Sequence, residues 1–336
     1  MEKDKQVSLT SSEITSLWAA YINDSAISCK FKYFISKVED KDIRPLAEQA
    51  FEIAQGNLKA MTEIFQREKY PIPYGFKLDE DVNVSAPRLY SDSYVLYYLY
   101  QAAQIALQGY SVNLGLAVRE DVYNHFNQCI SQLTSFMRKL INLLLSKGLY
   151  IRSPYLPIPQ NIDFVKKQSF LKGFLGEKRP LTGTEITNLF TNFQRNAFGV
   201  ATLTGFSQAA QSKEVVKYLI RGKEIAKKHC DILGTILRED DLPVPMTWHS
   251  EVTYSTDPVF SDKLMMFFTT TLIALSIGFY GTSMAVSPRK DLSLLYVRLS
   301  AEIAKYAEDG ANILIENGWL EQPPMAPDRD ELAKQG

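Results

Sequence analysis

Cysteine and histidine are both scarce in this chain, with three of each among 336 residues. Cys29, Cys129 and Cys230 each lie within an apolar helical pattern. An odd number of cysteines at such positions predicts small buried side chains in a reducing compartment, and it argues against a disulfide framework.

Net charge is lacking too, because 37 Lys and Arg residues balance 38 Asp and Glu residues, leaving −1. This balance argues against a basic nucleic-acid-binding stripe and against a polybasic membrane tail. The first six residues are mostly charged and lack the apolar core of a secretory signal. We therefore expect a cytoplasmic protein with no nucleic-acid partner and no membrane.

Familiar catalytic motifs are missing as well. The chain has no nucleophile elbow, P-loop, dinucleotide fingerprint or Cys-x-x-Cys pair. We therefore expect no catalytic residues and no cofactor, and we favour a structural or binding role over an enzymatic one.

Two long segments, 94–118 and 264–286, contain no charged residue at all. Each is long enough to span a bilayer, which takes about 20 apolar residues. The first carries glutamine and asparagine, and the second is rich in threonine, serine and glycine. We therefore favour helices covered by protein over membrane spans. The simplest cover is each segment by the other, across a pseudo-two-fold axis.

What the chain does contain is an internal repeat. Leu9–Leu17 reads LTSSEITSL, and Leu181–Leu189 reads LTGTEITNL, a shift of 172 positions. The same shift relates the Pro-Ile-Pro at 71–73 to the Pro-Val-Pro at 243–245, and from residue 91 onward the shift becomes 170. An offset that holds over helix starts and proline loops indicates tandem duplication of one domain.

Each repeat predicts four long helices. Capping boxes open the first, apolar residues spaced alternately by three and four mark the second, and serine N-caps precede the third. Glycine in the left-handed conformation is expected to end the fourth. The predicted signals are Thr10 with Glu13 and Thr182 with Glu185 for the first helix; a second helix over about 42–69 or from about 213; Ser91 or Ser261 for the third; and a fourth from about 120 or 290 to Gly148 or Gly318.

The connections predict a topology. Between the second and third helices lie about 20 residues that open on Pro-x-Pro, which favours extended backbone. Such a link can reach the far end of the bundle, as in a ferritin-like fold with one long crossover, although a compact Ω-loop is an alternative. We therefore expect an all-α protein of two ferritin-like four-helix bundles. The expected division is a disordered tail at 1–8, a first bundle at 9–150, an ordered linker at 151–180, a second bundle at 181–321 and an exposed tail at 322–336.

The linker holds four large apolar residues: Phe164, Phe170, Phe174 and Leu175. A segment this apolar is unlike a free linker. We expect it to pack along the second bundle and to hold the two repeats together.

A di-metal centre in a ferritin-like bundle takes Glu-x-x-His motifs that project inward. No histidine of this chain follows a glutamate by three positions, so we expect no metal. The weak candidates are His229, which lies five positions after Glu224, and the repeat-related pair Glu52 and Glu224. We interpret the two glutamates as solvated flank residues and the histidine as hydrogen-bonded.

Other unusual residues have plainer explanations. Asp121 and Asp291 recur at the start of the fourth helix, where a carboxylate suits the helix dipole. Lys223 stands in an apolar seam, from which its ammonium can extend to water. The tyrosines of segment 90–100 could line a ligand groove, but at helical spacing they more often pack at an interface.

Five strings resemble a known family: FLKGFLGEKRPL at 170–181, RGKEIAKKH at 221–229, DDLPVPMTW at 240–248, FSDKLMM at 260–266 and AKYAEDGAN at 304–312. They are similar to a domain-of-unknown-function family (number 3231) from endospore-forming bacilli, and the resemblance covers nearly the whole chain. It implies tandem ferritin-like bundles with an architecture similar to the coat F type of spore coat proteins. It implies no activity and no catalytic residues.

The leading expectation is therefore a non-enzymatic structural or interaction protein with an unknown protein partner, associated with the spore or with stress. The alternative is a ferritin-like protein that binds a metal or small molecule at a degenerate site.

Overall fold

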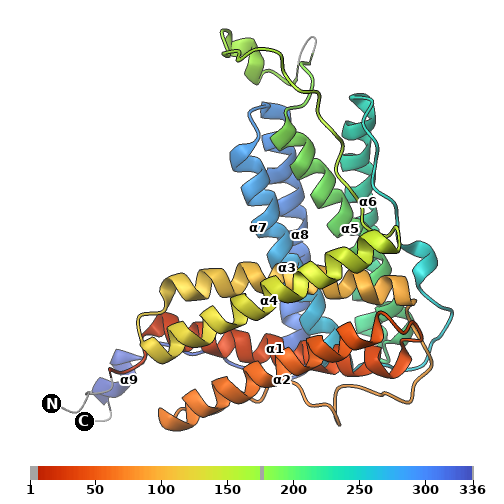
Figure 1. The fold of residues 1–336 in the computed structure, drawn as a ribbon. Helices are drawn as coiled ribbons and strands as arrows, with labels where there is room; N and C mark the ends of the chain where they lie inside the picture. Colours follow the sequence, from red (N-terminus) through yellow and green to blue (C-terminus); the bar gives the residue numbers. More distant parts are fainter. Residues whose placement is uncertain (1–6, 175–177, 335–336) are drawn as a thin grey trace. The chain divides into compact units, whose positions relative to one another are not determined.

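The computed structural model describes residues 7–174 and 178–334, and over these residues the chain is helical, with no β-strand (Figure 1). Tyr90 and Val252 form an isolated antiparallel bridge. The all-α prediction is thus confirmed. The helices are α1 (Ser11–Lys37), α2 (Arg44–Arg67), α3 (Asp92–Leu116), α4 (Glu120–Ser146), the 3-10 helix η1 (Gln168–Leu171), α5 (Gly183–Ala209), α6 (Lys213–Glu239), the 3-10 helix η2 (His249–Glu251), α7 (Asp262–Val286), α8 (Lys290–Glu316) and α9 (Arg329–Lys334).

The predicted helix ends are confirmed at several places. Both capping boxes form: Thr10 caps α1 with Glu13, and Thr182 caps α5 with Glu185. Glycine follows the C-cap of α4 and of α8, with φ of 68° and 67°, the left-handed conformation that glycine adopts without steric cost. These local signals place the ends of the long helices.

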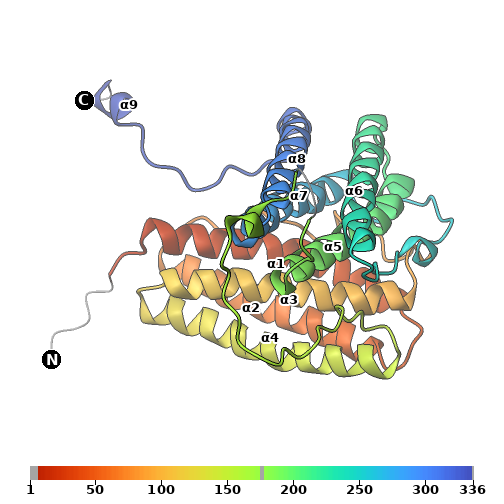
Figure 2. The ribbon, with the colours of Figure 1, turned by 90° about the horizontal axis from the view of Figure 1, so that it is seen from above.

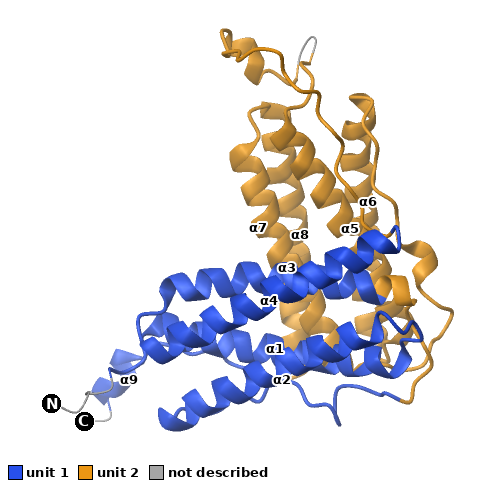
Figure 3. Ribbon diagram, in the orientation of Figure 1, with its two compact units in different colours: residues 1–84, 95–148, 320–336 blue, residues 85–94, 149–319 orange. Residues whose placement is uncertain are grey.

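The chain divides into two compact units (Figure 3). Unit 1 comprises residues 1–84, 95–148 and 320–336, and unit 2 comprises 85–94 and 149–319. The units differ from the sequence repeats in two segments. Residues 85–94 of the first repeat belong to unit 2, and the C-terminal segment after 319 belongs to unit 1.

In unit 2, α5 packs on α6 and α7, and α8 packs on α6 and α7 (Figure 2). Leucine and phenylalanine side chains from these helices form its core. Those that are buried to 2% exposure or less include Leu189, Phe190, Phe206, Leu233, Leu264 and Leu299.

In unit 1, α2 packs on both α1 and α4. Its core is likewise apolar, and side chains with at most 1% exposure include Leu17, Phe34, Met61, Phe65, Phe126 and Leu140. The C-terminal segment is held by Glu321, whose carboxylate accepts backbone N–H bonds from Tyr74 (2.9 Å) and Gly75 (3.0 Å).

Segment 85–94 joins unit 2 through its aromatic residues. The Tyr90 ring stacks on Tyr94 with centroids 4.0 Å apart, and Tyr94 stacks on Phe198 of α5 at 4.7 Å. The Tyr90 hydroxyl donates to the carbonyl of Thr202 at 2.8 Å. These tyrosines therefore pack in a core and do not line a ligand groove.

The linker corrects one expectation. Phe164 is 79% exposed and Phe174 is 59% exposed, so the prediction that both are buried against a bundle is wrong. Only Phe170 is partly covered, by the Arg179 guanidinium 4.0 Å from its ring centroid. Phe164 and Phe174 lie in irregular backbone on either side of η1, so no helix or strand carries their side chains onto a core. Leu175 lies outside the described residues, as do residues 1–6 and 335–336 of the predicted tails.

By length and composition, α7 could cross a membrane. In the most apolar 18-residue stretch of this helix, 33% of the residues are buried.

Candidate functional site

A chain of hydrogen-bonded polar side chains runs through the apolar core of unit 1. The Tyr110 hydroxyl on α3 lies 2.8 and 2.7 Å from the two carboxylate oxygens of Asp24 on α1. The Asn57 amide on α2 donates to the same hydroxyl at 3.2 Å. The chain continues to α4, where the Cys129 thiol donates to Asn57 at 3.3 Å and lies 3.8 Å from His125 Nε2. Four helices thus contribute to one buried cluster.

Unit 2 holds a related chain. The Tyr280 hydroxyl on α7 accepts from the Asn196 amide on α5 at 2.8 Å and lies 2.9 Å from His229 Nδ1 on α6. His229 Nε2 lies 3.3 Å from Glu302 on α8. Glu302 also binds Lys228 at 2.7 Å, so this chain reaches from the core to the surface.

These two runs of hydrogen-bonded side chains, one in each unit, occupy equivalent positions in the two repeats. The 172-residue shift relates Asp24 to Asn196 and Asn57 to His229, and the 170-residue shift relates Tyr110 to Tyr280. The tyrosine is kept in both units while its two partners differ. This equivalence could have been found from the sequence, because polar residues recur at the same shift inside apolar helical patterns.

Burial shifts the pKa values of the acid and of the histidines in both runs of hydrogen-bonded side chains. It raises the pKa of Asp24 to about 7, against the hydrogen bonds from Tyr110 and Asn57. It lowers the pKa of His125 to about 4 and also lowers the pKa of His229, which Glu302 partly offsets. Both histidines are therefore neutral at neutral pH.

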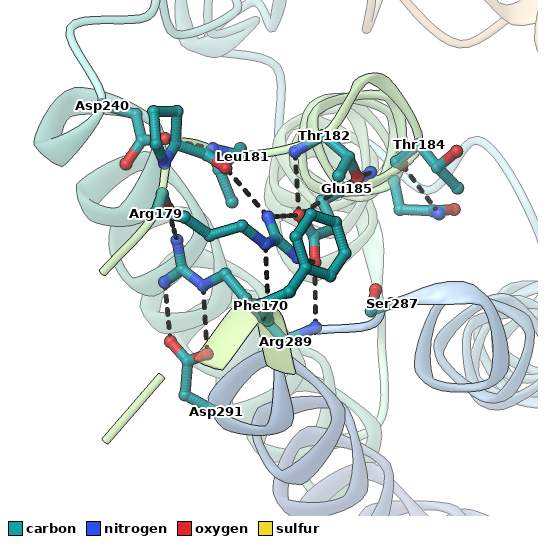
Figure 4. A network of polar contacts seen from close by, with 12 residues as sticks. Phe170, Arg179, Leu181, Thr182, Thr184, Glu185, Asp240, Ser287, Arg289 and Asp291 are labelled. Carbon is teal, nitrogen blue, oxygen red and sulfur yellow. Dashed lines mark hydrogen bonds and ion pairs between the residues drawn. The ribbon is translucent and has the colours of Figure 1, made fainter. Parts of the chain in front are cut away.

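A second network joins the ends of helices in unit 2 (Figure 4). Glu185, fully buried, accepts two bonds from Arg179 at 2.7 and 2.9 Å and a backbone bond from Arg289 at 3.0 Å. Arg289 in turn binds Asp291 at 2.7 Å. Burial acts to raise the pKa of Glu185, but Arg179 and the backbone donors outweigh it and lower that pKa to about 2. The network ties the start of α5 to the start of α8.

Unit 1 has a related network, in which the buried glutamate accepts from backbone groups without an arginine side chain and the arginine binds a second carboxylate. Glu13 accepts from the backbone N–H groups of Val118 (2.9 Å) and Arg119 (2.7 Å). Arg119 binds Asp121 at 2.6 Å and Glu68 at 2.7 Å. Asp121 and Asp291 are thus arginine partners as well as residues at a helix start. The sequence interpretation missed the arginines because their partners lie over 50 residues away or across a turn.

The weak metal candidates do not come together. Glu52 is exposed on α2, and Glu224, whose side chain is 57% exposed, lies 3.6 Å from the Lys223 ammonium. Lys223 itself is only partly buried. His229 is fully buried and belongs to the core chain of unit 2. Within residues 7–174 and 178–334, no three His, Cys, Asp or Glu side chains are placed to share a metal ion.

Chemically, the core chains can hold or move a proton, since each links a tyrosine hydroxyl to an acid, an amide or an imidazole. The helix-end networks are paired ions with satisfied hydrogen bonds, and they stabilise the fold.

Comparison with known proteins gives a family and one structural likeness. The model of the family described as "Protein of unknown function (DUF3231)" matches twice, over residues 2–162 and 169–332. A Bacillus halodurans protein described as a spore coat protein is 21% identical, with a TM-score of 0.40, and its whole length aligns with 46% of this chain. No curated protein matches the chain significantly. Because the family model covers both halves in tandem, the chain belongs to the DUF3231 family of proteins of unknown function.

Proposed function

We propose that this chain is a non-enzymatic interaction protein whose linker, residues 155–165, is its binding segment. The observation that carries the proposal is the exposure of large apolar side chains in this stretch. Ile158 is 93% exposed, Ile162 is 89% exposed and Phe164 is 79% exposed. Contiguous exposed apolar surface on a soluble protein is typical of an interaction site.

The order of the residues supports this role. Leu156, Ile158, Ile162 and Phe164 all stand at even positions, so they would share one face if the segment paired as a strand. Pro157 and Pro159 stand at odd positions and would remove donors from one edge only. A strand of this kind can add to an edge offered by a partner.

The partner we propose is a second copy of the chain, joined through antiparallel pairing of two linkers about a two-fold axis. Such isologous pairing buries the same apolar face from each copy. The test is the oligomeric state of the full chain, measured by sedimentation over a range of concentrations. Ile158→Ser with Ile162→Ser should abolish the dimer, whereas Asn161→Ser with Asp163→Ser on the opposite face should leave it. A chain that is monomeric at every concentration contradicts the proposal.

We also propose that each repeat is a ferritin-like four-helix bundle. In unit 2 the helix neighbours run in the cyclic order α5, α6, α8, α7. This order supports a ferritin-like four-helix bundle with one long crossover.

We also propose that the uncharged helices α3 and α7 cover each other, so that the two repeats pack together. Ala106→Glu and Ser276→Arg should then each lower the melting temperature, and unchanged melting in both variants would contradict the pairing.

The spore is the place of action that we propose, because the sequence motifs resemble a family from endospore-forming bacilli whose architecture is similar to that of coat F type spore coat proteins. An antibody against the chain should detect it in purified spores and not in vegetative cells. Detection in vegetative cells alone would contradict this assignment.

A binding role in the core is the second candidate, favoured by the buried His229 between Tyr280 and Glu302. Metal analysis of protein purified without chelators or a histidine tag tests it. Stoichiometric metal that is lost in His229→Gln but kept in Glu224→Gln would favour this candidate over the interaction role.

A further inference from the structure

The Asp24 carboxyl group is an unusual side chain for the middle of an apolar helical core. It is 7% exposed, and the Tyr110 hydroxyl that it contacts lies on another helix, α3. Both of its oxygens approach the same Tyr110 hydroxyl, which has only one proton to donate, and the Asn57 amide is its other side-chain donor. An ionised carboxylate has room for about four hydrogen bonds, so this environment suits the neutral acid better than the anion.

Among the residues that the structure describes, the groups that shift the pKa of Asp24 are the uncharged Tyr110 and Asn57, and no cationic side chain is among them. On α1, the Lys30 ammonium lies 4.0 Å from the centroid of the Tyr98 ring, and burial lowers its pKa well below the ordinary value. On α4, His125 is neutral at neutral pH because burial lowers its pKa. Cys129, also on α4, is kept protonated because burial raises its pKa. On α3 burial raises the pKa of Tyr110, and α2 offers only the uncharged Asn57.

Unit 2 provides an internal comparison. At the position equivalent to Asp24 it has Asn196, whose amide donates a hydrogen bond to the Tyr280 hydroxyl at 2.8 Å. A neutral amide therefore fills this place in a core of the same design. The protonated carboxylic acid is the form of Asp24 that most resembles it in charge and shape.

We propose that Asp24, with Tyr110 and Asn57, is a proton-binding site that makes unit 1 more stable as the pH falls through neutrality, and that unit 2 lacks this site because Asn196 replaces the acid. The raised pKa of Asp24, about 7 in the fold against an ordinary 3.8, agrees with this. Because the folded state binds the proton more tightly, the stabilisation is complete below the ordinary pKa and is lost as the pH rises through 7.

The test is urea unfolding of the full chain between pH 5 and pH 8, comparing the wild type with Asp24→Asn. Taking the difference between the two proteins cancels the titration of His125 and of every other shared group. At pH 8 the variant should be more stable than the wild type. The ratio of the unfolding equilibrium constant of the wild type to that of the variant should then fall by up to about tenfold for each pH unit below pH 7. Asp163→Asn, which changes an exposed acid of the linker, should differ from the wild type by the same amount at every pH.

A difference between Asp24→Asn and the wild type that does not vary from pH 5 to pH 8 overturns the proposal. If Asp24→Asn fails to fold, carbon-13 NMR of the wild-type chain labelled at aspartate carboxyls decides the question. One aspartate signal that titrates near pH 7 supports the site, and titration of every aspartate below pH 5 overturns it.

Discussion

At the scale of single residues, two glycines set how closely α6 and α8 approach. Tyr218 on α6 and Tyr306 on α8 stack with centroids 4.2 Å apart, and each hydroxyl donates to the other residue's carbonyl, at 3.0 and 2.9 Å. A Cβ atom at Gly222 would lie 2.2 Å from the Tyr306 hydroxyl, and one at Gly310 would lie 2.1 Å from the Tyr218 hydroxyl. Glycine is required at both positions because each hydroxyl occupies the place of a side chain.

Gly222→Ala should therefore destabilise the chain by about 1–3 kcal/mol, through overpacking and loss of the buried bond to Tyr218. The loss is measured as the change in free energy of unfolding in urea. Gly199→Ala is the matched control: it lies inside α5 with open space around its Cβ position. It should stabilise by about 0.5–1 kcal/mol through helix propensity.

A second substitution separates packing from backbone effects. Adding Tyr306→Phe to Gly222→Ala removes the nearest clashing atom and leaves the ring carbon Cζ at 2.8 Å. The double variant should therefore recover part of the stability that Gly222→Ala loses. If the second change adds its own loss instead, the hydroxyl is not the cause.

At the scale of helices, the sequence was enough to place most ends. The spacing of Thr10 and Thr182 to a glutamate three residues later predicts the capping boxes, and glycine predicts the end of α4 and of α8. Both predictions succeed because they depend on interactions between residues that are close in the sequence. The bond from the Arg289 backbone N–H to Glu185 was missed, because these two residues lie 104 positions apart in the sequence. Likewise, the polar core chains needed tertiary contacts that no local pattern contains.

The buried Glu185 should govern the acid stability of unit 2. Its pKa is about 2 in the fold against an ordinary 4.5, so ionisation stabilises the folded state above pH 4.5, and this contribution is lost as the pH falls toward 2. Glu185→Gln should therefore lower the free energy of unfolding by about 3 kcal/mol at pH 7. This loss should become smaller as the pH falls below 4.5. Urea unfolding at pH 7 and at several values down to 3.5 measures the change.

Glu224→Gln is the control for this prediction, because its side chain is largely exposed and lies at no helix end. It should change the free energy of unfolding little at any pH. A loss for Glu185→Gln that is the same at pH 7 and pH 3.5 would mean that the side chain acts through its shape and not through its charge.

At the scale of the whole molecule, the duplication was legible in the sequence because both copies kept their caps and proline loops. What the repeat could not reveal is the exchange of segments between units. Residues 85–94 of the first half complete unit 2, and Glu321 of the second half closes on Tyr74 and Gly75 of unit 1. The exchange depends on which surfaces pack together after folding, and an alignment of the two repeats does not predict those surfaces.

This exchange predicts the behaviour of a nicked chain. Phe164 and Tyr155 are 79% and 83% exposed, whereas most aromatic residues of the helices are buried. At a concentration at which the chain is monomeric and its linkers are unpaired, brief treatment with chymotrypsin should therefore cut the linker first. The two fragments should nevertheless stay together under native conditions. Within unit 2, Ser91 N–H donates to the Glu251 carbonyl at 2.9 Å and Thr253 N–H donates to the Leu89 carbonyl at 2.9 Å, and Tyr90 is packed on α5.

Gel filtration after digestion measures the outcome, with a parallel run in urea to show that the chain has been cut. Co-elution in buffer and separation in urea is the expected result. Tyr90→Ala should promote release of the fragments, because it removes the stacked ring and the hydroxyl that anchor segment 85–94, whereas Tyr155→Ala changes an exposed linker residue and should not. Fragments that separate in buffer without any substitution would show that the exchanged segments do not hold the two halves together.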